Sequence, residues 1–422
     1  MSNPILALTP SGYKGQTATA PKVYSVLPSD GSGDFTFDRA NGLATRINKD
    51  GLVEEVANDT PRFNYLNSTC PSLLLASQRT NLQVYSQEFD NALWAKSGTS
   101  VSADNTISPS GELNADKIQR TTTGSNNVND TLNKATSQLN YTTSIFVKQG
   151  EGDFFAMRAQ GTYPSRVDLR FQFSTKQIIQ NVASSSFTAL SSNVEEFKNG
   201  WFRISMTYTT DVANALTNYF TPRSSSGDID STDINANANC FLWGCQVEEK
   251  SDSSSYIPTQ NTAITRFVDI CKDAGNADLF NVSELSLFFD VNNFKPDTGS
   301  FSYIVLTDGQ SFPINMIRFD YKQDRIELSN YVNGTLGFFY TITSVVPNQR
   351  NKMALTISTA RTKVYFNGVL KITTAGDNIP LGLNSLSFTN RTGSGGTFQG
   401  EVQDARVYNR ILTETEAIKL TT

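Results

Sequence analysis

The sequence contains no histidine. Histidine is the side chain used most often as a general base near neutral pH, and it is the commonest metal ligand. Its absence from all 422 residues excludes Ser-His-Asp triads and Cys-His dyads. Catalysis would have to rest on carboxylates, lysine or tyrosine. This lack favours a protein that presents surfaces over an enzyme, and no catalytic residue is assigned.

Cysteine is scarce, with Cys70, Cys240, Cys245 and Cys271 and no Cys-x-x-Cys pair. Neither a disulfide framework nor a zinc site is indicated. Cys240 and Cys245 flank Phe-Leu-Trp-Gly, and an odd separation along one strand predicts that they face opposite sides of a sheet. We interpret the cysteines as small hydrophobic residues.

Long runs of positive charge or of apolar residues are also missing. The formal charge is −5, and no Lys/Arg run could follow a phosphate backbone, so no nucleic-acid partner is expected. No stretch approaches the roughly 20 apolar residues of a membrane helix. Because Met1-Ser2-Asn3-Pro4 lacks the basic start of a signal peptide, we expect synthesis in a host cytoplasm, without a membrane segment.

Aromatic residues are plentiful, with 27 Phe, 15 Tyr and 3 Trp, and they can fill large cores. Apolar residues alternate with polar ones over 167–173, 202–208 and 285–291, which predicts strands with one buried face. Asn199-Gly200 and Asn367-Gly368 predict tight turns. The second turn lies within a predicted hairpin, 363–372. The sequence Thr413-Glu414-Thr415-Glu416 has the form of a capping box and predicts one or two terminal helical turns.

These signals predict an all-β protein of tandem antiparallel β-sandwich domains with an extended N-terminal arm. The length favours two or three domains. From composition we expect an arm over 1–80, a first jelly roll over 81–271 and a second over 279–422.

Motifs in the first two thirds of the chain resemble a module of bacteriophage tail, fibre and head-spike proteins. They include Pro61-Arg62-Phe63-Asn64-Tyr65, Phe89 to Trp94, Gly200-Trp201-Phe202-Arg203 and Tyr256-Ile257-Pro258-Thr259. From about residue 280, Tyr365-Phe366-Asn367-Gly368 and Gly400 to Arg410 resemble a concanavalin A or laminin G type jelly roll. The first resemblance implies a carbohydrate-binding-module-like jelly roll.

The resemblance implies a virion structural protein, a fibre or capsid decoration subunit, located on the particle and mounted on head or tail. Residues 1–80 would attach to other virion proteins, and the jelly rolls would bind a host surface glycan. A homotrimer is the first expectation, since phage fibres are commonly trimers. Two alternatives stay open: a polysaccharide depolymerase using a carboxylate pair, and a purely architectural subunit.

Sugar sites combine an aromatic face with polar side chains that satisfy hydroxyls. By this criterion Trp94 beside Asn91 is a candidate, although a core position for Trp94 is favoured. Tyr163, and Tyr331 with Asn333, are expected in polar loops and are further candidates. Trp201 and Trp243 lie within strand-like sequence and are interpreted as structural.

Asp228, Asp230 and Asp233 offer closely spaced oxygens that could hold a structural calcium ion. The spacing lacks a full calcium-loop pattern, so a solvated acidic loop is favoured and no cofactor is assigned. A glycosidase needs two carboxylates facing each other across a cleft. The adjacent pairs Glu195-Glu196 and Glu248-Glu249 should point opposite ways on a strand and are interpreted as surface charges.

Overall fold

The computed structural model describes residues 3–12, 22–40, 43–280, 282–294, 301–309, 314–343, 345–375, 379–390 and 396–422. Within these ranges the α-helices are α1 (Ala277–Phe280) and α2 (Glu414–Thr421), and strands make up most of the rest. The predicted all-β class is confirmed. No helix of the described part is long and apolar enough to cross a membrane.

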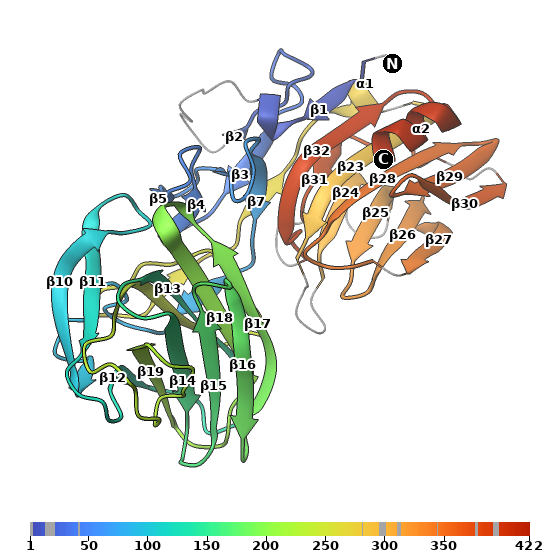
Figure 1. The fold of residues 1–422 in the computed structure, drawn as a ribbon. Coiled ribbons are helices and arrows are strands. Elements are labelled where there is room, and N and C mark those ends of the chain that lie inside the picture. Colours follow the sequence, from blue (N-terminus) through green and yellow to red (C-terminus); the bar gives the residue numbers. More distant parts are fainter. Residues whose placement is uncertain are drawn as a thin grey trace. The chain divides into compact units, whose positions relative to one another are not determined.

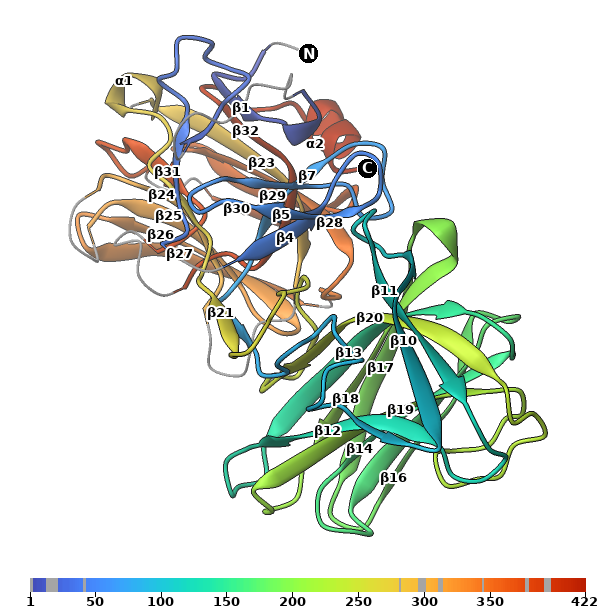
Figure 2. The same cartoon turned by 90° about the vertical axis from the view of Figure 1, so that its left-hand side faces the viewer.

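The chain forms two compact units (Figures 1 and 2). Unit 1 contains Met1–Gly42, Val56–Gln78 and Phe267–Thr422, and unit 2 contains Leu43–Glu55 and Arg79–Arg266. Each unit is therefore assembled from segments that are distant in the sequence.

Unit 2 is a sandwich of two antiparallel sheets. The first, called the β20 sheet, has the strand order β10 (Thr99–Ile107), β11 (Leu113–Arg120), β20 (Asn239–Glu248), β13 (Asn140–Gln149), β18 (Trp201–Thr209) and β17 (Thr188–Glu196). The second, called the β14 sheet, has the order β16 (Gln177–Ser184), β15 (Arg166–Gln172), β14 (Phe154–Gln160), β19 (Ala215–Arg223), β12 (Asn127–Asn133) and β9 (Ala95–Ser97). Strands β8 (Arg79–Asn81) and β21 (Ile264–Arg266) pair separately.

The core of unit 2 follows the predicted alternation. Leu169 and Phe171 of β15 pack with Ile204 and Met206 of β18 in one buried cluster. The other face of β18 is buried as well: the Arg203 guanidinium donates to the carbonyl of Ser254 at 2.7 Å. A second layer therefore covers the outer side of the β20 sheet.

Unit 1 has a larger sheet, called the β23 sheet, in which β1 (Leu6–Leu8) also pairs with β32. Its order is β30 (Val369–Ala375), β29 (Arg361–Phe366), β28 (Arg350–Ser358), β23 (Glu284–Asn293), β32 (Gly400–Tyr408), β7 (Ser72–Leu75) and β6 (Arg62–Asn64). The facing sheet, called the β25 sheet, has the order β27 (Thr335–Thr343), β26 (Arg325–Val332), β25 (Met316–Tyr321), β24 (Tyr303–Thr307) and β31 (Ser385–Ser387). A small sheet joins β2 (Lys22–Val23), β3 (Phe35–Asp38) and β22 (Ile270–Lys272).

The local predictions for unit 1 are confirmed. Asn367 and Gly368 have φ values of 47° and 78°, and they join β29 to β30 in a hairpin. Thr413 caps α2 through a capping box with Glu416. In unit 2 the turn at Asn199-Gly200 also has the predicted positive φ values, 61° and 77°.

The described residues between 1 and 80 are built into sheets. Leu73 of β7 pairs with Val402 of β32, whereas β4 (Ala44–Ile47) and β5 (Val53–Val56) form a separate pair. Within unit 1, Asp269 binds Arg39 at 3.1 Å and also Arg62. Buried long-range contacts therefore hold these described residues in place.

Candidate functional site

A pocket of about 390 Å³ lies on unit 2, on the side of the β20 sheet that faces away from the sandwich core. Its lining combines aromatic, amide, hydroxyl and carboxylate groups. These residues are Thr45, Asn48, Val53, Glu54, Glu55, Gln87, Ser110, Glu112, Asn114, Trp243, Tyr256 and Pro258. Small-ligand sites combine hydrophobic and aromatic side chains with a few placed polar groups, and both kinds line this pocket.

Trp243 and Tyr256 supply the aromatic part of the pocket. Their ring centroids are 4.7 Å apart, and Phe146 contacts Trp243 edge-on at 5.3 Å. Trp243 faces this side because of a bulge: Ser144 pairs with Gln246, but Phe146 pairs with Trp243. The extra residue reverses the alternation of side chains along β20.

The same bulge overturns the prediction for two cysteines. Cys240 and Cys245 are both buried in the sandwich core, on one side of the sheet. The prediction of opposite faces was wrong because Gly244 takes a left-handed φ of 62°, which breaks the period of two between them.

Tyr256 is fixed by hydrogen bonds on both of its polar ends. Its hydroxyl shares a 2.6 Å hydrogen bond with Ser86 Oγ, and its carbonyl accepts from Thr45 Oγ1 at 2.5 Å. Burial raises the pKa of Tyr256, so the hydroxyl stays protonated. The ring is therefore a rigid wall of the pocket and not a reactive group.

Two polar atoms of the lining lack hydrogen-bond partners although they are buried: Trp243 Nε1 and Asn114 Oδ1. Trp243 is 2% exposed. Leaving a buried donor or acceptor unpaired costs about 1–3 kcal/mol. One donor and one acceptor in the same pocket thus offer a hydrogen-bonding pattern that a hydroxyl-bearing ligand can complete.

The charge of the pocket is negative. Glu54, Glu55 and Glu112 line it, and no Lys or Arg is among the lining residues. Glu54 is paired with Arg46 at 2.7 Å. Within the described residues no three His, Cys, Asp or Glu side chains are grouped to hold a metal ion. The pocket suits a neutral or cationic ligand.

Trp94 does not supply a binding surface. It is 1% exposed, packs against Phe89 at 4.7 Å, and donates from Nε1 to the carbonyl of Tyr85. Asn91 is a turn residue, whose Oδ1 accepts from the N–H of Leu93 at 3.1 Å. Both side chains serve the local fold, which matches the core position favoured for Trp94.

None of the other aromatic candidates is among the residues that line the pocket. Tyr163 is 68% exposed and its ring lies 5.5 Å from the Arg166 guanidinium. Tyr331 lies in β26 and not in a loop, since it pairs with Met316. Asn333 follows in the turn, with a φ of 50°. Tyr331 and Asn333 belong to unit 1, so the structure does not bring the candidates together.

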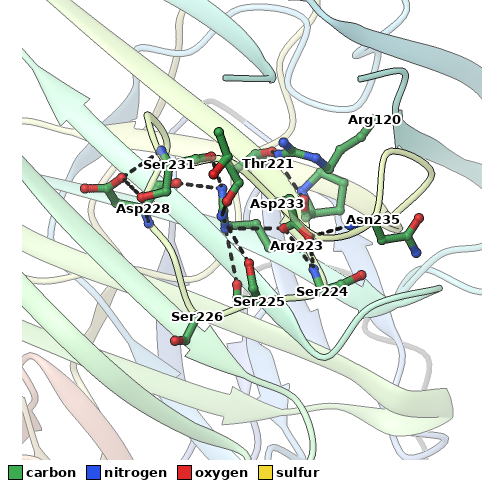
Figure 3. Close-up of polar contacts among 12 residues, drawn as sticks. Arg120, Thr221, Arg223, Ser224, Ser225, Ser226, Asp228, Ser231, Asp233 and Asn235 are labelled. Carbon is green, nitrogen blue, oxygen red and sulfur yellow. Dashed lines mark hydrogen bonds and ion pairs between the residues drawn. The ribbon is translucent and has the colours of Figure 1, made fainter. Parts of the chain in front are cut away.

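The three aspartates proposed for calcium face different partners (Figure 3 shows two of them). Asp230 pairs with Arg158 at 2.8 Å, and Asp228 accepts from Ser231 Oγ at 2.6 Å. Asp233 lies 3.6 Å from Arg223. The Arg223 guanidinium donates to loop carbonyls, including that of Asp228 at 2.7 Å. The Arg223 guanidinium thus holds this loop together, in the position where a metal ion was considered.

The adjacent glutamates of the pairs Glu195-Glu196 and Glu248-Glu249 do not act together, because their described members bind different groups. Glu196 pairs with Lys176 at 2.7 Å, and Glu249 accepts from the Tyr141 hydroxyl at 3.0 Å. Glu248 is buried and accepts from Ser254 Oγ at 2.7 Å. The prediction of a surface charge was wrong for Glu248, because the second layer covers this strand.

Sequence reasoning missed the pocket. Trp243 was interpreted as structural, and its burial fits that, but the residue also lines the pocket and its Nε1 is unpaired. A signal existed in Gly244, a glycine inside a strand pattern, which often marks a bulge or a close approach. The glutamates carried no signal, since they come from 54–55 and 112, far from Trp243 in the sequence.

Comparison with known families supports the fold of unit 1. Residues 283–417 match the model of a family described as the concanavalin A-like lectin/glucanases superfamily. The match confirms the concanavalin A-like expectation for this part of the chain. No curated protein matches the chain.

Among solved structures, the chain is similar to the CBM40 module of the Ruminococcus gnavus IT-sialidase, with 15% identity over 36% of this chain and 94% of that one, at a TM-score of 0.31. Domain 4 of a Geobacillus stearothermophilus GH43 arabinanase, in complex with arabinotriose, matches at 16% identity over 41% and 84%, with a TM-score of 0.28. Sheep galectin-11 matches at 14% identity over 30% and 89%, with a TM-score of 0.22. Scores this low carry no information on function.

Proposed function

We propose that this chain is a glycan-binding adhesive protein and that the pocket of unit 2 is its binding site. The observation that carries the proposal is the pair of unpaired buried atoms, Trp243 Nε1 and Asn114 Oδ1, in a pocket with an aromatic floor. Sugars present apolar ring faces and hydroxyls that both donate and accept. The concanavalin A-like match in unit 1 adds a second domain of a lectin-like class.

The ligand expected in this pocket is a neutral or amino sugar. Three glutamates line the pocket, Arg46 pairs with one of them, Glu54, and no basic residue is among the lining. A sugar carboxylate would therefore meet charges of its own sign. A protonated amine or neutral hydroxyls would instead be stabilised by Glu55 and Glu112.

Binding of the full chain to an array of neutral, amino and acidic glycans tests the proposal. We expect Asn114→Ala to weaken binding about tenfold, because an acceptor of a sugar hydroxyl is lost. Asn193→Ala, on the exposed face of edge strand β17, is the matched control and should bind as the unaltered protein does. Absence of binding to every neutral and amino glycan, or full binding by Asn114→Ala, overturns the proposal.

A second candidate function is polysaccharide hydrolysis in the same pocket. It is favoured by one observation, the three glutamates in the lining, since glycosidases use a pair of carboxylates. Glu55 and Glu112 are exposed to solvent, whereas a general acid is tuned by an apolar environment. Release of reducing ends that Glu112→Gln abolishes while glycan binding persists would establish this alternative; binding without release would exclude it.

The sequence resemblance to phage fibre, spike and decoration proteins supports a proposal for where the protein is located. We propose that it is exposed on a virion, is attached to other virion proteins through residues 1–80, and assembles as a trimer. Mass spectrometry and immunogold labelling of purified particles test the location. Light scattering of the purified chain tests the trimer, and a monomer at micromolar concentration would contradict it.

A further inference from the structure

The β25 sheet of unit 1 has a second polar surface, which we call the Arg318 face. It is the side of the sheet turned away from the unit 1 core, and Tyr303, Arg318, Asp320, Ser329 and Phe339 define it. The neighbouring residues Ile317, Phe319 and Leu328 point into the core. Alternation along the strands therefore places the five on the opposite side.

The five residues are neighbours across the strands. Arg318 pairs in register with Ser329, and Ser329 pairs with Phe339. Tyr303 pairs with Asp320. Directly opposed side chains on one face lie within contact distance, so an aromatic ring, a guanidinium, a hydroxyl and a carboxylate lie side by side. Phe339 is exposed, and Asp320 and Ser329 are buried.

Three polar atoms of the Arg318 face are buried without hydrogen-bond partners. They are Arg318 Nε, Asp320 Oδ1 and Ser329 Oγ. The Arg318 guanidinium lies 5.3 Å from the Tyr303 ring centroid, which fixes its orientation through a cation–π contact. The three unpaired atoms belong to adjacent positions of one sheet face, which points to an occupant that completes them.

The charges of this face favour an anion at Arg318. Asp320 is paired with Lys322 at 2.6 Å, and Glu327 is paired with Arg325 at 2.7 Å. Each acid therefore has its own cation, and Arg318 has no ion pair among the described residues. A guanidinium fork matches a carboxylate in shape and charge.

Phe339 supplies the apolar part of the surface. It is 50% exposed and stands in register with Ser329, next to Arg318. A pyranose ring can stack on such a face while its carboxylate reaches the guanidinium. Hydroxyls of the same sugar can donate to Asp320 Oδ1 and bond to Ser329 Oγ.

We propose that the Arg318 face binds a carboxylate-bearing sugar, a hexuronate or a sialic acid, as a site separate from the pocket of unit 2. The two sites differ in unit, in residues and in the sign of charge that they accept. An experiment that disproves one of the two sites therefore leaves the proposal for the other unchanged.

The test uses the full chain on an array of sialylated and hexuronate glycans, each printed beside its methyl ester. We expect the affinity for the acids to be at least about tenfold higher than for their esters, because the esters lose the charge-assisted hydrogen bonds to Arg318. Arg318→Gln should lose a similar factor. Arg318→Lys should lose less, since it keeps the charge but not the fork.

Phe339→Ala should weaken binding several-fold without unfolding unit 1, since the ring is exposed. Arg361→Gln is the matched control, because this arginine is exposed and lies on β29 of the other sheet of unit 1, and it should bind as the unaltered protein does. Asn114→Ala in unit 2 should leave acidic-sugar binding intact. Equal binding of acids and esters, no binding of any acidic glycan, or full binding by both Arg318→Gln and Phe339→Ala overturns the proposal.

Discussion

Trp243 and Cys245 are two residues apart on β20, yet they face opposite sides of the sheet. Trp243 packs with Phe146 and Tyr256 beside the pocket, whereas Cys245 is buried in the sandwich core. A regular strand would place residues i and i+2 on the same side. Gly244 between them has a φ of 62°, and the bulge that it makes possible turns the tryptophan towards the pocket.

Replacing Gly244 with alanine should destabilise unit 2 and disturb the pocket. A Cβ at this position would lie 3.0 Å from Phe146 Cδ2 and 3.2 Å from Tyr256 Cε2. We expect a loss of about 2–3 kcal/mol in the free energy of unfolding, from the left-handed backbone and the tight contacts together. Urea denaturation measures it.

Gly200→Ala is the control for this variant. Gly200 also has a positive φ, 77°, but a Cβ there would meet nothing within 4 Å. It should lose only the conformational cost, about 1 kcal/mol. Equal losses for both variants would contradict a special role for the packing at the bulge.

Ionisation of the buried Asp116 carboxyl should lower the free energy of unfolding of unit 2 as the pH rises. Burial raises the pKa of this carboxyl to about 6, against the opposing effect of hydrogen bonds from the N–H groups of Asp104 and Phe89. A carboxyl with a raised pKa in the folded state stabilises the fold at pH values below the unfolded pKa. That contribution is lost as the pH rises through about 4 to 6, and it amounts to at most about 3 kcal/mol.

The measurement is the difference in unfolding free energy between the unaltered protein and Asp116→Asn, followed from pH 4 to pH 7. We expect the unaltered protein to lose stability relative to the variant over this range. Asp30→Asn is the control, because its hydrogen bonds with Ser32 lower the pKa of Asp30 and place its titration below the range. A difference in unfolding free energy between Asp116→Asn and the unaltered protein that stays constant with pH would refute the raised pKa of Asp116.

Arg223 should be essential for the loop that follows β19. Its side chain is fully buried and donates to the carbonyls of Ser231 at 3.0 Å and Thr232 at 2.8 Å. Arg223→Ala would leave Asp233 buried without its cation, so we expect a loss of about 3–5 kcal/mol. Lys176→Ala, which breaks an exposed pair with Glu196, should cost under about 1 kcal/mol.

The same contacts predict that calcium has little effect. Loop oxygens that could coordinate the ion already accept hydrogen bonds from Arg223, so neither millimolar calcium nor a chelator should change the Tm. A calcium-dependent rise in Tm of several degrees, abolished in Asp228→Asn, would show that a metal site exists after all.

Trp94→Ala should destabilise unit 2 without a specific effect on glycan binding. Its ring packs between Phe89 and Phe220, and a buried tryptophan replaced by alanine costs about 3–5 kcal/mol. Tyr163→Ala, at an exposed position, should leave the Tm unchanged. Binding per folded molecule, measured at a temperature where both variants are folded, should equal that of the unaltered protein; a selective loss in Trp94→Ala would contradict its core role.

Local signals in the sequence carried reliable information. The alternation over 202–208 predicted a strand, and Asn367-Gly368 predicted a hairpin turn, because the strand period and the left-handed φ of such turns depend on neighbouring residues alone. The capping box at Thr413 predicted a helix start for the same reason. These features also fixed the all-β class.

The candidate site depended on contacts between distant residues. Asp269 binds Arg39 and Arg62 across more than 200 residues of sequence, and composition gives no sign of that pairing. In the same way, the pocket joins 45–55, 110–114 and 243–258. An aromatic residue among amides in the sequence, such as Trp94, was therefore a poor guide to an exposed surface.

The sequence by itself determined the strands, the tight turns, the terminal helix and the lack of histidine chemistry, since each follows from residue type and local spacing. Only the tertiary structure decided which tryptophan lines a pocket, which carboxylates share it, and that Arg318 forms no ion pair among the described residues. Those outcomes depend on strand register and on a single bulge, and a shift of one residue in either moves a side chain to the other face of its sheet.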